Sequence, residues 1–296
     1  MASRTTTRTF CSIRISRCCT PPASLRPPKT WDEFRQDARQ VTRASQPGGP
    51  IDQWATVMPI LPDGFNNRFP VFLTAFGASL LTPDLKHSAI LSPATREAIT
   101  YLVDLNTKDK AMPPGVNQMG GDQPRRMLAQ NRVAFLFEPF SLIANLKGID
   151  PNFDSYHALI ATPMPISPQY PSPFRTVMGV RALFINAHTQ HPDEAWRFVK
   201  FMLEPEQLQG YFLGSGQLPA RSSLDQSDPA ILQDPLAAAH ASDLSRATVV
   251  PQTPKWPEIL ETMRQNLSAA FSGTKTADQA LNDANQAVET VLQRPQ

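Results

Sequence analysis

Residues 179–186 read GVRALFIN, and residues 191–202 read HPDEAWRFVKFM. The first stretch is mostly apolar and predicts a strand, which we place at 176–185. In the second stretch Pro192 is a favoured first residue of a helix, and Ala195, Val199 and Met202 are spaced along one helical face. A strand followed directly by an amphipathic helix is the building unit of α/β proteins.

The same alternation extends in both directions along the chain. On the C-terminal side, helices are predicted over 204–213, from Pro254 to Phe271, and from Thr276 onward, where Thr276 and Gln279 have the spacing of a capping box. On the N-terminal side, the periodicity predicts helices beginning near residues 31, 66, 93, 124 and 140, and strands over 55–61, 133–137 and 157–161. Strands that alternate with longer helices predict the α/β fold class.

The composition fits a folded protein that does not bind nucleic acid. Of the 296 residues, 41% are hydrophobic and 18% are charged, which is enough to form a core. The net charge of +2 is dominated by residues 1–26, which hold five arginines and no acid. The rest of the chain has 28 − 5 = 23 basic and 26 acidic residues, a net charge of −3. We therefore expect no nucleic-acid partner.

Residues 1–26 form a leader that differs from the rest of the chain. It holds all three cysteines and is rich in Arg, Ser and Thr. Arginines interrupt its apolar residues, so no signal peptide is recognisable, although the composition is similar to that of a transit peptide. We expect a disordered or out-of-frame leader, and the transit peptide stays open as an alternative. No window approaches the ~18 consecutive apolar residues of a membrane helix.

Five motifs follow one another in an order that resembles a known family. They are GVRALFIN (179–186), HPDEAWRFVKFM (191–202), GSGQLPAR (214–221), PKWPEI (254–259) and GTKTADQAL (273–281). This order resembles the C-terminal part of the extracellular solute-binding proteins (family 1) of bacterial ABC importers, in particular the sugar-binding, maltose-binding-protein-like group. The resemblance implies a periplasmic-binding-protein-like type II fold, in which two lobes close on a ligand about a hinge. It also implies a protein that is not an enzyme and needs no cofactor or metal ion.

The resemblance divides the chain into four parts. Residues 27–165 are similar to the main part of the second lobe, 166–220 to a segment returning to the first lobe, and 221–296 to the closing helices of the second lobe. Most of the first lobe's N-terminal part has no counterpart after the leader (1–26). The strand at 176–185 should therefore lack sheet partners and form an exposed edge.

Four residues of the second lobe are candidates for ligand binding. Asn67 and Arg68 precede a buried helix at a place where the family presents residues to the cleft; helix capping and a solvated arginine are the alternative. Glu138 and Phe140 stand where the family has Gly-Pro-Trp. Phe140 could stack on a sugar or be ordinary core, and Glu138 could accept hydrogen bonds from hydroxyl groups.

Three further candidates lie in the later segments. Gly179 and Arg181 fall where the returning strand meets the cleft; Gly179 would allow close approach of the backbone, and a buried Arg181 would need a partner or ligand. Trp256 matches a position that is a cleft aromatic in some members and a packing residue in others. His188 and His191 have an HxxH spacing, but Pro192 interrupts the helix that a metal site would need, so we interpret them as surface histidines.

The implied function is that of the substrate-binding component of an ABC importer. Such a protein captures a small solute, here a sugar, and delivers it to permease subunits in the membrane. The resemblance implies a monomer in the periplasm or outside the cell. Two alternatives stay open: a non-binding fragment or pseudogene product of such a protein, and a glycosidase with paired carboxylates.

Overall fold

The computed structural model describes residues 3–8, 10–15 and 27–295 of the chain. The strands are β1 (Ser3–Arg8), β2 (Phe10–Ile15), β3 (Phe135–Pro139), β4 (Leu159–Thr162), β5 (Thr176–Val177), β6 (Gly179–Leu183), β7 (Leu218–Pro219) and β8 (Ala247–Thr248). The α-helices are α1 (Trp31–Val41), α2 (Pro62–Phe76), α3 (Pro93–Thr107), α4 (Asp122–Ala129), α5 (Leu142–Ile149), α6 (Ser155–Ala158), α7 (Pro192–Met202), α8 (Pro205–Ser215), α9 (Ser222–Ser227), α10 (Pro229–Leu232), α11 (Pro235–Ser242), α12 (Trp256–Phe271) and α13 (Ala277–Gln293). Short 3₁₀ helices span Val116–Gln118 and Asp243–Arg246.

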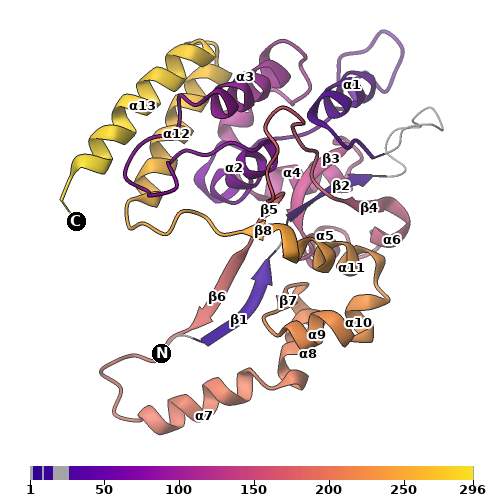
Figure 1. Ribbon diagram of the computed structural model, residues 1–296. Coiled ribbons are helices and arrows are strands. Elements are labelled where there is room, and N and C mark those ends of the chain that lie inside the picture. The colour runs from indigo at the N-terminus through magenta and orange to yellow at the C-terminus, as the bar shows by residue number, and fades with distance from the viewer. Residues whose placement is uncertain (1–2, 9, 16–26, 296) are drawn as a thin grey trace.

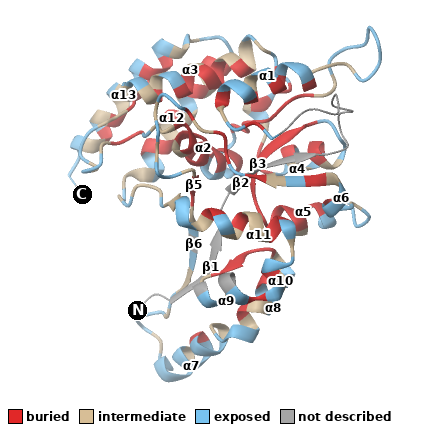
Figure 2. Cartoon of the chain, turned by 45° about the vertical axis from the view of Figure 1, so that its right-hand side comes forward, coloured by how far each residue is buried: buried red, intermediate tan, exposed pale blue. Residues whose placement is uncertain are grey.

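The core of the main body is built around a cluster of aromatic rings. Trp31 stacks on Phe76 with ring centroids 5.7 Å apart and meets Phe72 and Tyr101 edge to face. Its ring also lies against Phe137 of β3, at 5.9 Å. These contacts join α1, α2, α3 and β3, and α12 and α13 pack against α3 (Figure 1). Buried residues are concentrated in this body, as Figure 2 shows.

The strands form three small sheets. Their strand orders are β3-β2-β4, β6-β1-β7 and β5-β8. The chain leaves the pair β5-β8 and enters the sheet β6-β1-β7 at Met178, whose N–H donates to the carbonyl of Thr248 at 2.7 Å. From there β6 runs away from the main body toward α7, and β1 lies antiparallel beside it (Figure 1).

The start of the chain differs from what the sequence indicated. Residues 3–8 and 10–15 lie within the leader that we expected to be disordered or out-of-frame. Instead, they form β1 and β2, and β2 is the central strand between β3 and β4. Disorder is therefore wrong for these two stretches; the remaining leader residues, 1–2, 9 and 16–26, lie outside the described residues.

The expectation of an unpartnered strand at 176–185 is also wrong. The strand breaks at Met178 into two short pieces, and both are paired. Gly179–Leu183 pairs antiparallel with β1, and Thr176–Val177 pairs parallel with β8. These ladders satisfy backbone N–H and C=O groups that an isolated strand would leave unpaired.

Most helix boundaries follow the local signals in the sequence. The side chains of Ser92 and Thr276 accept hydrogen bonds from the first turns of α3 and α13, and Thr276 forms a complete capping box. The buried helix α2 ends at Gly77, whose φ of 79° is the left-handed conformation that favours glycine. The strand expected at 55–61 does not form. That segment is irregular and buried up to Ile60, and it is held by single hydrogen bonds such as that from the N–H of Ala55 to the carbonyl of Ala111, at 3.0 Å.

Candidate ligand-binding site

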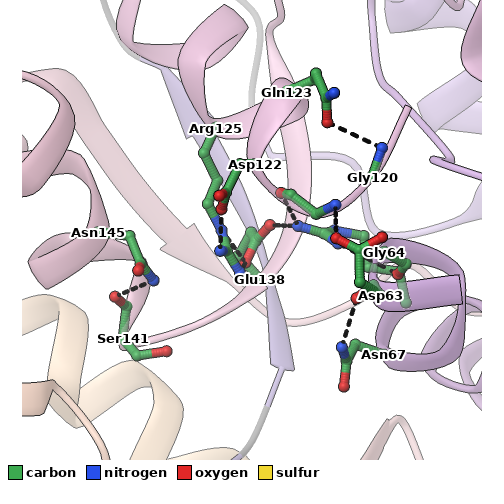
Figure 3. A network of polar contacts seen from close by, with 12 residues as sticks. Asp63, Gly64, Asn67, Gly120, Asp122, Gln123, Arg125, Glu138, Ser141 and Asn145 are labelled. Atoms are coloured by element: carbon green, nitrogen blue, oxygen red, sulfur yellow. Dashed lines mark hydrogen bonds and ion pairs between the residues drawn. The ribbon is translucent and has the colours of Figure 1, made fainter. Parts of the chain in front are cut away.

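Polar side chains gather where the first turns of α2 and α4 meet the end of β3. Asp63 accepts the N–H of Gly121 at 2.7 Å and so ties the start of α2 to the start of α4. Figure 3 shows Asp63, Asn67, Asp122 and Glu138 in this region. An acidic residue near a helix N-terminus is stabilised by the helix dipole and the free N–H groups there, which explains Asp63 in the first turn of α2.

A buried ion network lies beneath these residues. Arg68 and Glu138 are 1% and 0% exposed and form an ion pair. Arg68 also donates to the carbonyls of Gly64 at 3.2 Å and Gly121 at 3.1 Å. The second carboxylate oxygen of Glu138 accepts from Nε and Nη2 of Arg125, at 3.3 and 3.2 Å. Burial, the largest single effect, lowers the pKa of Arg125, but the charges and hydrogen bonds of Glu138 and Asp122 together outweigh it and raise the pKa above its ordinary value.

This network changes the roles expected of three candidates. Arg68 is a buried structural cation and not a solvated side chain. Both carboxylate oxygens of Glu138 are occupied by guanidinium groups, so Glu138 does not offer the hydroxyl contacts that we expected of it. Asn67 is exposed on α2, and its amide donates to the carbonyl of Asp63 at 2.8 Å. Arg125 and Asp63 are members of the network that sequence reasoning missed.

Phe140 lines a cavity of about 280 Å³ between α5, α6, α8 and α10. The ring is only 6% exposed, and it stacks on Phe212 of α8 with centroids 5.5 Å apart and an angle of 18°. Polar groups in the lining come from Lys147, Tyr156 and Asp234. The cavity therefore joins residues of the segment 27–165 with residues of α8.

Tyr156 and Asp234 form the polar pair of this cavity. The phenol donates to a carboxylate oxygen of Asp234 at 2.6 Å. Desolvation, followed by this hydrogen bond, raises the pKa of Tyr156 to about 12. The phenol therefore keeps its proton at neutral pH and remains a donor. Neither residue was a candidate from the sequence, because no local signal links two residues 78 positions apart.

The three remaining candidates lie elsewhere. Gly179 and Arg181 are on β6, in a different sheet from Glu138, and both are exposed. An exposed Arg181 lacks the burial that would have required a ligand or partner. Trp256 is the first residue of α12; it is half-buried and packs against the core, as expected of a packing residue.

Comparison with known proteins shows the family of this fold. Residues 19–209 match the family model of the bacterial extracellular solute-binding proteins. The chain belongs to this family. The resemblance inferred from the sequence is thereby confirmed. The family is one of binding proteins, so this solute-binding protein is not an enzyme.

Similar sequences and structures agree with this assignment. A maltotriose-binding protein of Pyrococcus abyssi (strain GE5 / Orsay) is 30% identical over 121 residues, which are 40% of this chain and 24% of that protein. The maltose-bound MalE3 of T. maritima superposes with a TM-score of 0.83 at 20% identity. The alignment covers 98% of this chain and 72% of the MalE3 chain. An ABC transporter solute-binding protein of Thermotoga lettingae TMO, bound with α-D-tagatose, gives 0.83 at 23% identity with the same coverage.

These likenesses show the mixed α/β fold of MalE-type binding proteins. The matched region spans about a quarter of the P. abyssi relative and just under three quarters of the two solved chains. Among the described residues, no helix has both the length and the apolar character needed to cross a membrane. Within the same residues, no group of three or more His, Cys, Asp or Glu side chains could hold a metal ion.

The contact between α8 and α5 gives a first testable prediction. Gly216 ends α8 with φ 65°, and a Cβ there would lie 2.9 Å from Cα of Ser141. We expect Gly216→Ala to lower the free energy of unfolding by more than about 1 kcal/mol, because the backbone is strained and the two helices must separate. Gly210→Ala is the matched control inside α8, since its Cβ would meet nothing within 4 Å. Urea unfolding of both variants measures the difference; equal stabilities would contradict the close approach.

Proposed function

We propose that this chain is the substrate-binding component of an ABC importer and that it binds a sugar. The observation that carries the proposal is the cavity beside Phe140. It combines apolar surface from Phe140 and Leu213 with a phenol, a carboxylate and an ammonium group. Sugars present apolar ring faces and hydroxyl groups that both donate and accept, and such a lining matches both features.

The family's architecture supports the lobe assignment that we propose. In this assignment residues 27–165 and 221–296 form the second lobe and 166–220 return to the first lobe; the alignments cover 72% of each of the two solved chains. The packing of α12 and α13 on α3 supports a second lobe that contains residues from both 27–165 and 221–296. The change of sheet at Met178 supports a crossing between lobes. Closure about such crossings would present the loaded form to the permease.

The compartment and the partners follow from the same proposal. The protein acts in the periplasm or outside the cell, as a monomer that meets the permease subunits of its importer. The sugar is held by Tyr156 and Asp234, which join the earlier candidate Phe140 in the lining of the cavity, whereas Asn67 does not belong to that lining. Because Phe212 covers one face of the Phe140 ring, the sugar contacts the part of the ring that lines the cavity.

Isothermal titration with maltose, maltotriose and D-tagatose tests the sugar site. We expect one of these sugars to bind, and Tyr156→Phe to weaken that binding about five- to tenfold, because one hydrogen bond to the sugar is worth about 1 kcal/mol. Tyr170→Phe is the control, since Tyr170 lies beside Gly77 at the end of α2. Absence of heat with all three sugars would reject the sugar and favour a non-binding fragment of a solute-binding protein.

A further inference from the structure

His240 of α11 is a fully buried residue that joins two parts of the candidate site. Its Nε2 lies 3.2 Å from the carbonyl oxygen of Glu138, and its ring meets Phe140 edge to face with centroids 5.8 Å apart. Its Nδ1 lies 2.8 Å from the carbonyl oxygen of Leu236, one turn earlier in the same helix. Sequence reasoning gave this histidine no role.

The two ring nitrogens face two acceptors. A neutral imidazole has one N–H, so it can donate to only one of the carbonyls. Burial lowers the pKa of His240, and the hydrogen bonds and the nearby Asp243 and Asp234 oppose that shift only in part. The neutral ring therefore predominates near neutral pH. Of these two hydrogen bonds, the one from Nε2 links α11 to another element, because Leu236 belongs to α11 itself.

A hydrogen bond to the backbone carbonyl of Glu138 restrains two parts of the candidate site. The side chain of the same residue receives Arg68 and Arg125, and two residues later Phe140 enters the cavity wall. One hydrogen bond to this backbone group therefore restrains both the buried ion network and the aromatic wall. A shift of the junction between β3 and α5 would move both at once.

We propose that His240 is a positioning residue of the ligand site, which fixes the β3–α5 junction by donating its Nε2 proton to the carbonyl of Glu138. The proposal rests on the proposed function for its effect on the ligand, and on the geometry alone for its effect on the junction. A residue in this role contacts no ligand. Its effect on affinity is exerted through Glu138 and Phe140.

Two substitutions of similar size separate positioning from mere packing. The amide of His240→Gln reaches the place of Nε2 and keeps a donor for Glu138. The amide of His240→Asn reaches the place of Nδ1 and keeps only the bond to Leu236. Both lose the ring contact with Phe140, and they differ in which carbonyl keeps its donor; because the bond to Leu236 lies within α11, a difference at the junction reports the bond to Glu138.

Hydrogen exchange over residues 138–143 and sugar titration are measured on the full chain and on both variants. We expect the junction to exchange about tenfold faster in His240→Asn than in His240→Gln. If a sugar binds, its Kd should rise about tenfold in the Asn variant and stay within about threefold of wild type in the Gln variant. A long-range ¹⁵N spectrum of the wild type should show the proton on Nε2.

The outcomes separate the two proposals. Equal exchange in the two variants, or a proton on Nδ1 of the wild type, overturns the positioning role. Slow exchange that is retained only in His240→Gln, together with no binding of any tested sugar, supports the positioning of the junction and rejects the sugar. If neither variant folds, the wild-type spectrum decides, since it needs no substitution.

Discussion

Glu138→Gln should lower the free energy of unfolding by about 3–5 kcal/mol, because removing one partner of a buried ion pair leaves the other charge uncompensated. Glutamine keeps the size and shape of the side chain, so the loss isolates the charge. The guanidinium of Arg68 is 1% exposed and has no water to replace the carboxylate. Its Nε already lacks a hydrogen-bond partner within the described residues, which leaves the group little means of adjustment.

Glu258→Gln is the matched control for this prediction. Glu258 also pairs with an arginine, Arg294, but the two side chains are 49% and 56% exposed. Such exposed pairs contribute about 0–1 kcal/mol, so the control should unfold close to wild type. Denaturant unfolding measures both variants. A loss in Glu138→Gln no larger than that in Glu258→Gln would show that the buried pair is not the source of stability at this junction.

A double variant tests the pairing itself. Arg68→Met removes the cation that Glu138→Gln would leave unpaired, so the combined loss should be smaller than the sum of the two single losses. For residues in one network, this interaction energy is about 0.5–3 kcal/mol. Additive losses would indicate that Arg68 and Glu138 act independently. The same variants read by sugar titration would report how far the network shapes the ligand site.

The sequence predicted separate elements far better than the contacts between them. The ends of α2, α3 and α13 follow from Gly77, Ser92 and Thr276, since capping acts within one turn of the chain. Arg68 and Glu138 were both candidates for the site, but nothing local joins residues 70 positions apart. Their pairing requires the topology that places the start of α2 beside the end of β3.

The two strands at the start of the chain differ in how far the local sequence indicates them. Residues 11–15 read CSIRI, in which apolar and polar residues alternate as in a strand. The arginines and adjacent cysteines favour foreign sequence, whereas the alternation favours the strand that forms. The partner of Gly179–Leu183 is β1, whose sequence SRTTTR shows no alternation, so nothing local predicts that pairing. Strand pairing is decided by distant segments, so one missed strand misplaces its neighbours as well.

At high concentration the chain should associate with itself. Several aromatic side chains lie exposed around α7: Phe184 is 78% exposed, Phe198 59% and Phe201 47%. Monomeric proteins rarely leave such apolar surface in water, and this end of the molecule is exposed over most of α7 (Figure 2). The free edge of β6, which pairs only with β1 in the described sheet, adds a second route to association.

Replacing Phe184 and Phe198 together by lysine should reverse this association. Burying one phenylalanine contributes about 1.5–3 kcal/mol, so the loss of two should weaken self-association by at least about tenfold even though both rings are already partly covered. Sedimentation equilibrium over a range of concentrations measures the change. The control replaces Ile51 and Leu91, which are 44% and 37% exposed elsewhere on the molecule, by lysine. Both pairs add the same charge, so equal effects would assign the association to net charge and not to the exposed aromatic side chains.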